Sequence, residues 1–175
     1  MGRFVNPGNG AFQADVNAEI YVDKTGLLRF TNQVINTNAA FICNSRPRRF
    51  GKSVTANMLA AYYSKGSDSK NIFSGLDISK SADYEKHRNQ YDVIHFDVQW
   101  CVEAISGSEK FVSFITESII KELQQVYPGI LDENVQSLPD ALSLINSALG
   151  IKFVVIIDEW DVLIRDEAGR KDLQN

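Results

Sequence analysis

The sequence is poor in the features of disulfide-rich, metal-rich and membrane proteins. Its 175 residues include only two cysteines and two histidines, and neither histidine has the spacing of a metal site. The cysteines, Cys43 and Cys101, lie in or beside apolar runs, which is typical of reduced thiols in a core. The chain has no run of about 20 apolar residues that could cross a membrane, and its start lacks the apolar run of a signal peptide. We therefore expect a cytoplasmic protein without a membrane partner.

An excess of positive charge is also missing. The chain has 18 basic and 22 acidic residues and a net charge of -4, which argues against a protein that binds nucleic acid over its whole surface. A local basic patch is compatible with this balance. Hydrophobic residues make up 44% and charged residues 23%, as in an ordinary folded protein, and the length suits a single domain.

Short apolar runs alternate with helical patterns along the chain. The runs that predict buried strands lie at residues 39–43, 91–98 and 153–157. Apolar residues at helical spacing predict helices at about 25–34, 52–63, 108–127 and 137–149. In the last of these helices, Ser137 is the expected N-cap and Gly150 the expected end. The alternation predicts an α/β fold with a mainly parallel sheet flanked by helices.

The first motif with chemical content, Arg-Pro-Arg-Arg-Phe-Gly-Lys-Ser, spans residues 46–53. It follows a predicted strand and opens a predicted helix, which is the context of a phosphate-binding P-loop, or Walker A motif. Backbone N–H groups at such a helix start point at phosphates, and Gly51 allows the backbone to approach them closely. Lys52 is expected to reach the β- and γ-phosphates, and the Ser53 hydroxyl to ligate Mg²⁺.

One position departs from the P-loop pattern G-x-x-x-x-G-K-[ST], because Arg46 stands where the first glycine is expected. Read alone, the motif also fits an ordinary helix start with a chance Gly-Lys-Ser. Pro47 lacks an N–H and favours an extended conformation at Arg46. We therefore expect the loop to turn late, mainly around Phe50 and Gly51.

The arginines of this loop have two possible uses: they can add charge at the nucleotide, or they can point away toward acidic groups. We expect a split, with at least one of Arg48 and Arg49 turned from the phosphates, because Lys52 and Mg²⁺ already neutralise most of the charge. Three merely solvated arginines are the alternative. The predicted nucleotide-binding residues are Arg46, Arg49, Phe50, Gly51, Lys52 and Ser53.

The second motif joins the apolar run 153–157 to Asp158 and Glu159, as in a Walker B strand. Asp158 is expected to hold Mg²⁺, directly or through water, and Glu159 to orient or deprotonate the attacking water. A buried strand followed by acidic loop residues is common when it stands alone. Two such motifs in this order, each after an apolar run, favour the P-loop interpretation, with Glu159 and Lys52 as catalytic residues.

Three segments resemble the bacterial AAA-ATPase-like family: Tyr-Val-Asp-Lys-Thr at 21–25, the loop at 46–53, and Ile-Asp-Glu-Trp-Asp at 157–161. Members typically begin this loop with Arg-Pro, as here, and have tyrosine where Trp160 stands. The resemblance implies ATP as the nucleotide, ATP hydrolysis and, in many members, a downstream domain similar to PD-(D/E)XK nucleases. The residues of the segment 21–25 suggest no mechanism by themselves.

Only a polar, charged stretch follows the Walker B strand, whereas P-loop ATPases with an Asp-Glu pair normally have two more strands there. We therefore expect residues 39–175 to be the front part of an ATPase core, truncated after the Walker B strand, with residues 1–38 as a lead-in segment. In that class one of the later strands lies between the P-loop and Walker B strands. Its absence predicts a gap in the sheet or two strands forced together, and weak or no ATP hydrolysis by this chain.

The sequence thus predicts a P-loop NTPase module that binds ATP and Mg²⁺ and hydrolyses ATP in the full-length protein. One alternative is a nucleotide-binding module without turnover. The other is a nucleic-acid-handling protein in which Arg46, Arg48 and Arg49 contact the phosphate backbone.

Overall fold

Two parallel β-strands form the centre of the molecule. The computed structural model describes residues 2–45, 50–105 and 110–164, and in it β1 (Asp92–Asp97) pairs with β2 (Phe153–Asp158). The register places Asp92 opposite Phe153 and Asp97 opposite Asp158. The predicted strands at 91–98 and 153–157 and their parallel arrangement are thereby confirmed, as part of a mixed α/β structure.

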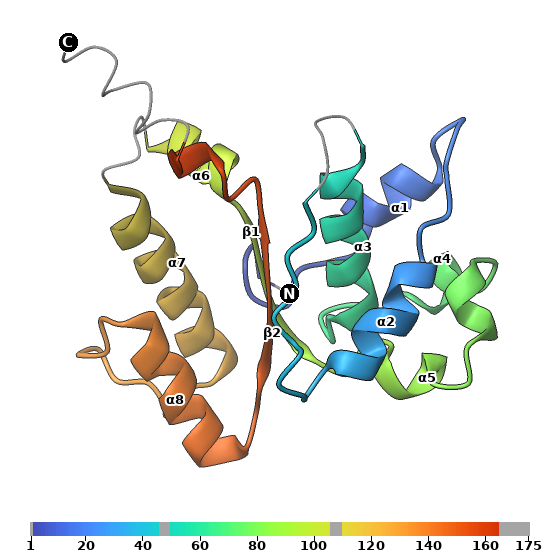
Figure 1. The fold of residues 1–175 in the computed structure, drawn as a ribbon. Helices are drawn as coiled ribbons and strands as arrows, with labels where there is room; N and C mark the ends of the chain where they lie inside the picture. The colour runs from blue at the N-terminus through green and yellow to red at the C-terminus, as the bar shows by residue number, and fades with distance from the viewer. Residues whose placement is uncertain (1, 46–49, 106–109, 165–175) are drawn as a thin grey trace, which may run out of the picture.

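Helices cover both faces of this small sheet (Figure 1). The helices on one side are α1 (Gly10–Val16), α2 (Gly26–Val34), α3 (Lys52–Tyr63), α4 (Lys70–Phe73), the 3-10 helix η1 (Asp77–Lys80) and α5 (Tyr84–His87). Those on the other side are α6 (Val98–Ala104), α7 (Phe111–Val126) and α8 (Leu138–Leu149). None of the helices in the described ranges is long and apolar enough to span a bilayer.

The core is divided into two hydrophobic clusters, one on each face of the sheet. Side chains alternate along a strand, so Val93 joins the cluster around α3 while Ile94 joins the cluster around α7. The predicted ends of α8 are confirmed: the Ser137 hydroxyl accepts a hydrogen bond from the Asp140 N–H at 3.3 Å. Gly150 ends the helix in the left-handed conformation, with φ of 68°.

The N-terminal segment lies along the other edge of β1. Val5 forms an isolated antiparallel bridge with Ile94, and the Asn6 N–H donates to the Val93 carbonyl at 2.7 Å. The Asn6 side chain also donates to Asp92, which is 4% exposed and forms an ion pair with Lys65 at 2.6 Å. These contacts fix the amino end of β1 in the sheet, where a buried carboxylate needs charged or polar partners.

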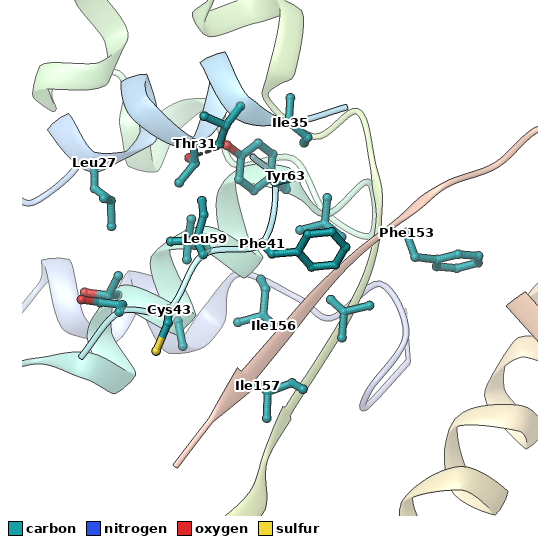
Figure 2. A pocket seen from close by; sticks show the side chains of 18 of the residues that line it. Leu27, Thr31, Ile35, Phe41, Cys43, Leu59, Tyr63, Phe153, Ile156 and Ile157 are labelled. Carbon is teal, nitrogen blue, oxygen red and sulfur yellow. Dashed lines mark hydrogen bonds between the residues drawn. The ribbon is translucent and has the colours of Figure 1, made fainter. Parts of the chain in front are cut away.

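The predicted strand at residues 39–43 is wrong, because residues 40–45 form no strand in the structure. Residues 37–44 and β2 form opposite walls of a groove of about 1030 Å³ instead of pairing with each other. Figure 2 shows Phe41 and Cys43 on one wall and Ile156 on the other. Within the described residues, the sheet consists of β1 and β2 alone.

Residues 39–43 are all exposed, because no strand in the described part of the chain pairs with them. Phe41 is 97% exposed, and Cys43 is exposed as well, so the expectation that Cys43 is a core thiol is wrong. Cys101 is buried, as expected, and burial raises its pKa to about 11. Nearby apolar residues thus predicted burial correctly for Cys101 but not for Cys43. The run that contains Cys43 pairs with no strand among the described residues.

Candidate functional site

The described part of the motif at residues 46–53 is its end, which turns at Gly51. This residue has a φ of 73° and precedes α3, and its carbonyl accepts hydrogen bonds from the N–H and the hydroxyl of Thr55 at 3.1 and 2.9 Å. The left-handed conformation favours glycine, so the turn at this position agrees with the late turn that the sequence predicts. The expected roles of Arg46, Arg48 and Arg49 fall outside the described residues, and Phe50 is 60% exposed.

The structure brings the two sequence motifs together through one ion pair. Lys52 lies in the first turn of α3, and Glu159 follows β2 directly. The Lys52 Nζ and Glu159 Oε1 atoms are 3.8 Å apart, and the two side chains are only 22% and 21% exposed. Both residues also line the polar end of the groove, together with Asp158.

Asp158 occupies the carboxyl end of β2 and is 7% exposed. It lies opposite Asp97 in the register, so the two strands end in carboxylates side by side. The Asp97 side chain accepts a hydrogen bond from the Trp100 N–H at 2.9 Å and thereby caps α6. His95 faces the same side of β1, where burial lowers its pKa and the charges of Asp158 and Asp97 partly oppose this shift.

Glu159 has an unusual backbone conformation for a residue with a side chain. Its φ is 51°, in the left-handed region, and its N–H donates to the Asp158 carboxylate at 3.0 Å. Strained conformations of this kind concentrate at functional sites, where the surrounding structure holds them. The turn carries the chain away from the end of β2 and leaves the Glu159 carboxylate beside Lys52.

Ser53 occupies a different position from the other predicted residues. It is exposed on the first turn of α3 and is not among the residues that line the groove. Lys52 and Asp158, which do line it, come from two elements that pack against each other. The predicted magnesium ligands, Ser53 and Asp158, are therefore placed at the start of α3 and at the end of β2.

Asp158 is the predicted magnesium ligand that lines the groove at this edge of the sheet. Within the described residues, no group of three or more His, Cys, Asp and Glu side chains could hold a metal ion. Mg²⁺ in nucleotide sites usually has one or two protein ligands, several waters and the phosphates of the substrate. The single buried carboxylate of Asp158 fits this form of binding, whereas the Ser53 hydroxyl lies outside the groove.

Sequence reasoning missed one residue next to the loop. Lys24 precedes α2, and its Nζ donates a hydrogen bond to the Phe50 carbonyl at 2.9 Å. No spacing or periodicity connects Lys24 to the loop in the sequence. The only signal was its place in the segment 21–25, to which no mechanism could be assigned.

Fold and site together describe an α/β protein with a lysine and two carboxylates clustered at the carboxyl ends of parallel strands. The chain belongs to the AAA-ATPase-like family of predicted AAA-ATPases, whose sequence model matches residues 14–175. Membership confirms the resemblance and supports a general role as an ATPase.

A curated relative also matches, an uncharacterized protein in the vnfD 5' region of Azotobacter chroococcum mcd 1. It is 29% identical over 153 residues, which are 87% of this chain and 28% of that protein. The chain therefore spans a small part of the length of this relative. No solved structure matches the chain.

Proposed function

We propose that the chain binds ATP with Mg²⁺ at the start of α3 and that the full-length protein hydrolyses the bound ATP. The observation that carries this proposal is the ion pair between Lys52 and Glu159, with 3.8 Å between Nζ and Oε1. It joins a P-loop-like turn to an Asp-Glu pair from a distant part of the sequence. Family membership supports the choice of an ATPase.

Each predicted residue has a distinct task in this proposal. The backbone N–H groups after Gly51 and the dipole of α3 favour phosphate oxygens at the helix start. Lys52 supplies a positive charge there and donates hydrogen bonds to the phosphate oxygens. Ser53 and Asp158 would hold Mg²⁺, which when bound draws charge from the phosphate oxygens.

Glu159 is proposed to accept a hydrogen bond, and then a proton, from the attacking water. Its carboxylate faces the Lys52 ammonium in the structure. Phosphates that bind Lys52 compete for this ammonium and weaken the ion pair. The same residues thus link phosphate binding to the availability of the Glu159 carboxylate.

Calorimetric titration with ATP, with and without Mg²⁺, tests the binding step. We expect Lys52→Ala to lower ATP affinity at least about tenfold, because hydrogen bonds to charged groups contribute about 1.5–3 kcal/mol. Lys70→Ala, at an exposed position of helix α4, is the matched control and should bind as the wild type does. Equal affinities of the wild type and Lys52→Ala would sink the proposal.

Glu159→Gln separates hydrolysis from binding in the full-length protein. The amide keeps the shape of the side chain but can neither accept the proton nor pair with Lys52 as a charge. We expect ATP to bind at least as tightly as to the wild type while phosphate release falls about a hundredfold or more. Unchanged hydrolysis by Glu159→Gln would exclude Glu159 as the base. If the wild type binds ATP without hydrolysing it, the alternative of a nucleotide-binding module without turnover is favoured.

A further inference from the structure

The segment 21–25 forms a tight clasp before α2. One oxygen of the Asp23 carboxylate accepts hydrogen bonds from the N–H and the hydroxyl of Thr25 at 2.8 and 2.7 Å, and the other accepts from the Asp77 N–H at 2.8 Å. The Thr25 hydroxyl oxygen accepts from the Ile78 N–H at 3.1 Å, and Thr25 is fully buried. Burial raises the pKa of Asp23, but these hydrogen bonds outweigh it and the pKa lies below its ordinary value.

The clasp holds the backbone on both sides of Lys24. Asp23 and Thr25 are hydrogen-bonded to the start of η1, so the backbone of Lys24 between them is anchored and its side chain extends from a fixed position. The Lys24 Nζ lies 2.9 Å from the Phe50 carbonyl oxygen. A Cβ atom built on Gly51 would be only 2.5 Å from the same Nζ, which places the ammonium directly against the turn of the loop.

Two lysines therefore lie at the start of α3. Lys52 opens the helix, and Lys24 reaches the peptide that precedes it. The helix start is itself the positive end of the dipole, so a second cation there raises the electrostatic potential further. Such a concentration of positive charge is favourable when an anion binds, and an ammonium that donates one hydrogen bond to a carbonyl retains two more donors.

We propose that Lys24 is a second lysine of the nucleotide site, which positions the Phe50–Gly51 peptide and adds positive charge for the phosphates of a nucleoside triphosphate. This inference rests on the proposed function, because it concerns the same phosphate site. It also gives the segment 21–25 a role: the Asp23 and Thr25 side chains hold Lys24 against the loop.

Lys24→Met and Lys24→Arg, titrated calorimetrically with ATP, ADP and AMP, test the proposal. Methionine keeps most of the length of the side chain and removes its charge and donors. We expect Lys24→Met to weaken ATP binding about tenfold and AMP binding much less, because the effect grows with the number of phosphates. Lys24→Arg should recover part of the loss. Lys80→Met is the control, since Lys80 lies in the same η1 that holds the clasp but is 75% exposed.

A readout without nucleotide tests the contact with the loop. Amide hydrogen exchange at Gly51 and Lys52 should be faster in Lys24→Met than in the wild type and in Lys80→Met. The thermal midpoint of unfolding should change little. A lower midpoint with equal losses for ATP and AMP would overturn the proposal, because it would mean that Lys24 only supports the fold.

Lys52→Ala distinguishes failure of this inference from failure of the proposed function. If the wild type binds ATP, Lys52→Ala weakens binding and Lys24→Met binds as the wild type does, the role of Lys24 is overturned and the proposed function stands. If the wild type binds no ATP, both are overturned.

Discussion

At the scale of single residues, Gly51 combines an unusual backbone conformation with a close contact. Its φ is 73°, and the Lys24 ammonium occupies the space where a side chain would begin. The left-handed conformation favours glycine here, and a side chain would also displace the Lys24 ammonium. The sequence suggested a different reason for glycine, the close approach of the backbone to phosphates, and the structure adds these two.

We expect Gly51→Ala to lower the free energy of unfolding by about 1–2 kcal/mol, the usual cost of a left-handed residue with a Cβ. Displacement of Lys24 should lower ATP affinity as well. Urea denaturation measures the first effect and calorimetry the second. Gly10→Ala is the matched control, because Gly10 begins α1 and a Cβ there would meet nothing within 4 Å. A stability of Gly51→Ala equal to that of Gly10→Ala would argue against the observed conformation.

At the scale of elements, a buried hydrogen-bond network joins α2 to α3. The Tyr63 hydroxyl donates to Asn32 at 2.8 Å and lies 2.6 Å from the Thr31 hydroxyl. Asn32 in turn donates to the Tyr62 hydroxyl at 3.1 Å. Lys24 lies just before α2, and Lys52 begins α3. By fixing the relative positions of these two helices, the network also helps to position the two lysines.

Tyr63→Phe should destabilise the protein by about 1–3 kcal/mol, because the buried side-chain oxygen of Asn32 would lose its donor. Thermal or urea unfolding measures the loss. Tyr84→Phe is the control: its hydroxyl is buried and has no hydrogen-bond partner among the described residues, so removing it should leave stability unchanged or slightly higher. The opposite order of the two variants would contradict the network.

At the scale of the whole molecule, one phenylalanine is buried in the core and another is exposed on the wall of the groove. Phe12 is completely buried and stacks on Phe73 with 5.1 Å between ring centres. Phe41, equally apolar, is 97% exposed on the wall of the groove. The difference lies in the presence of packed neighbours and not in the side chain.

Phe41→Ser should therefore change the free energy of unfolding of this chain by no more than about 0.5 kcal/mol, as surface substitutions usually do. Phe12→Ala should cost about 3–5 kcal/mol because it leaves a cavity in the core. Both values come from urea denaturation of the chain. A large loss for Phe41→Ser would mean that the groove is closed over Phe41 in solution.

Local sequence signals predicted the elements that depend mainly on their own residues. The helices at 52–63 and 137–149 follow from apolar periodicity and from the Ser137 and Gly150 caps, and the observed bounds differ by at most one residue. The apolar runs at 91–98 and 153–157 predicted strands, and these form β1 and β2 because each pairs with the other. The run at 39–43 is also apolar but pairs with no strand among the described residues, and a strand needs hydrogen bonds from a neighbour as well as apolar side chains.

The sequence by itself determined which residues are proposed to contact phosphates and Mg²⁺, because Gly51, Lys52 and the Asp158–Glu159 pair have the required chemistry and lie at element ends. Only the tertiary structure decided which of them meet. The parallel pairing of β1 and β2 and the packing of α3 against β2 bring Lys52 and Glu159 together, and the clasp at Asp23 and Thr25 brings Lys24 to the loop. These contacts join residues far apart in the chain, and neither periodicity nor motif spacing encodes such distances.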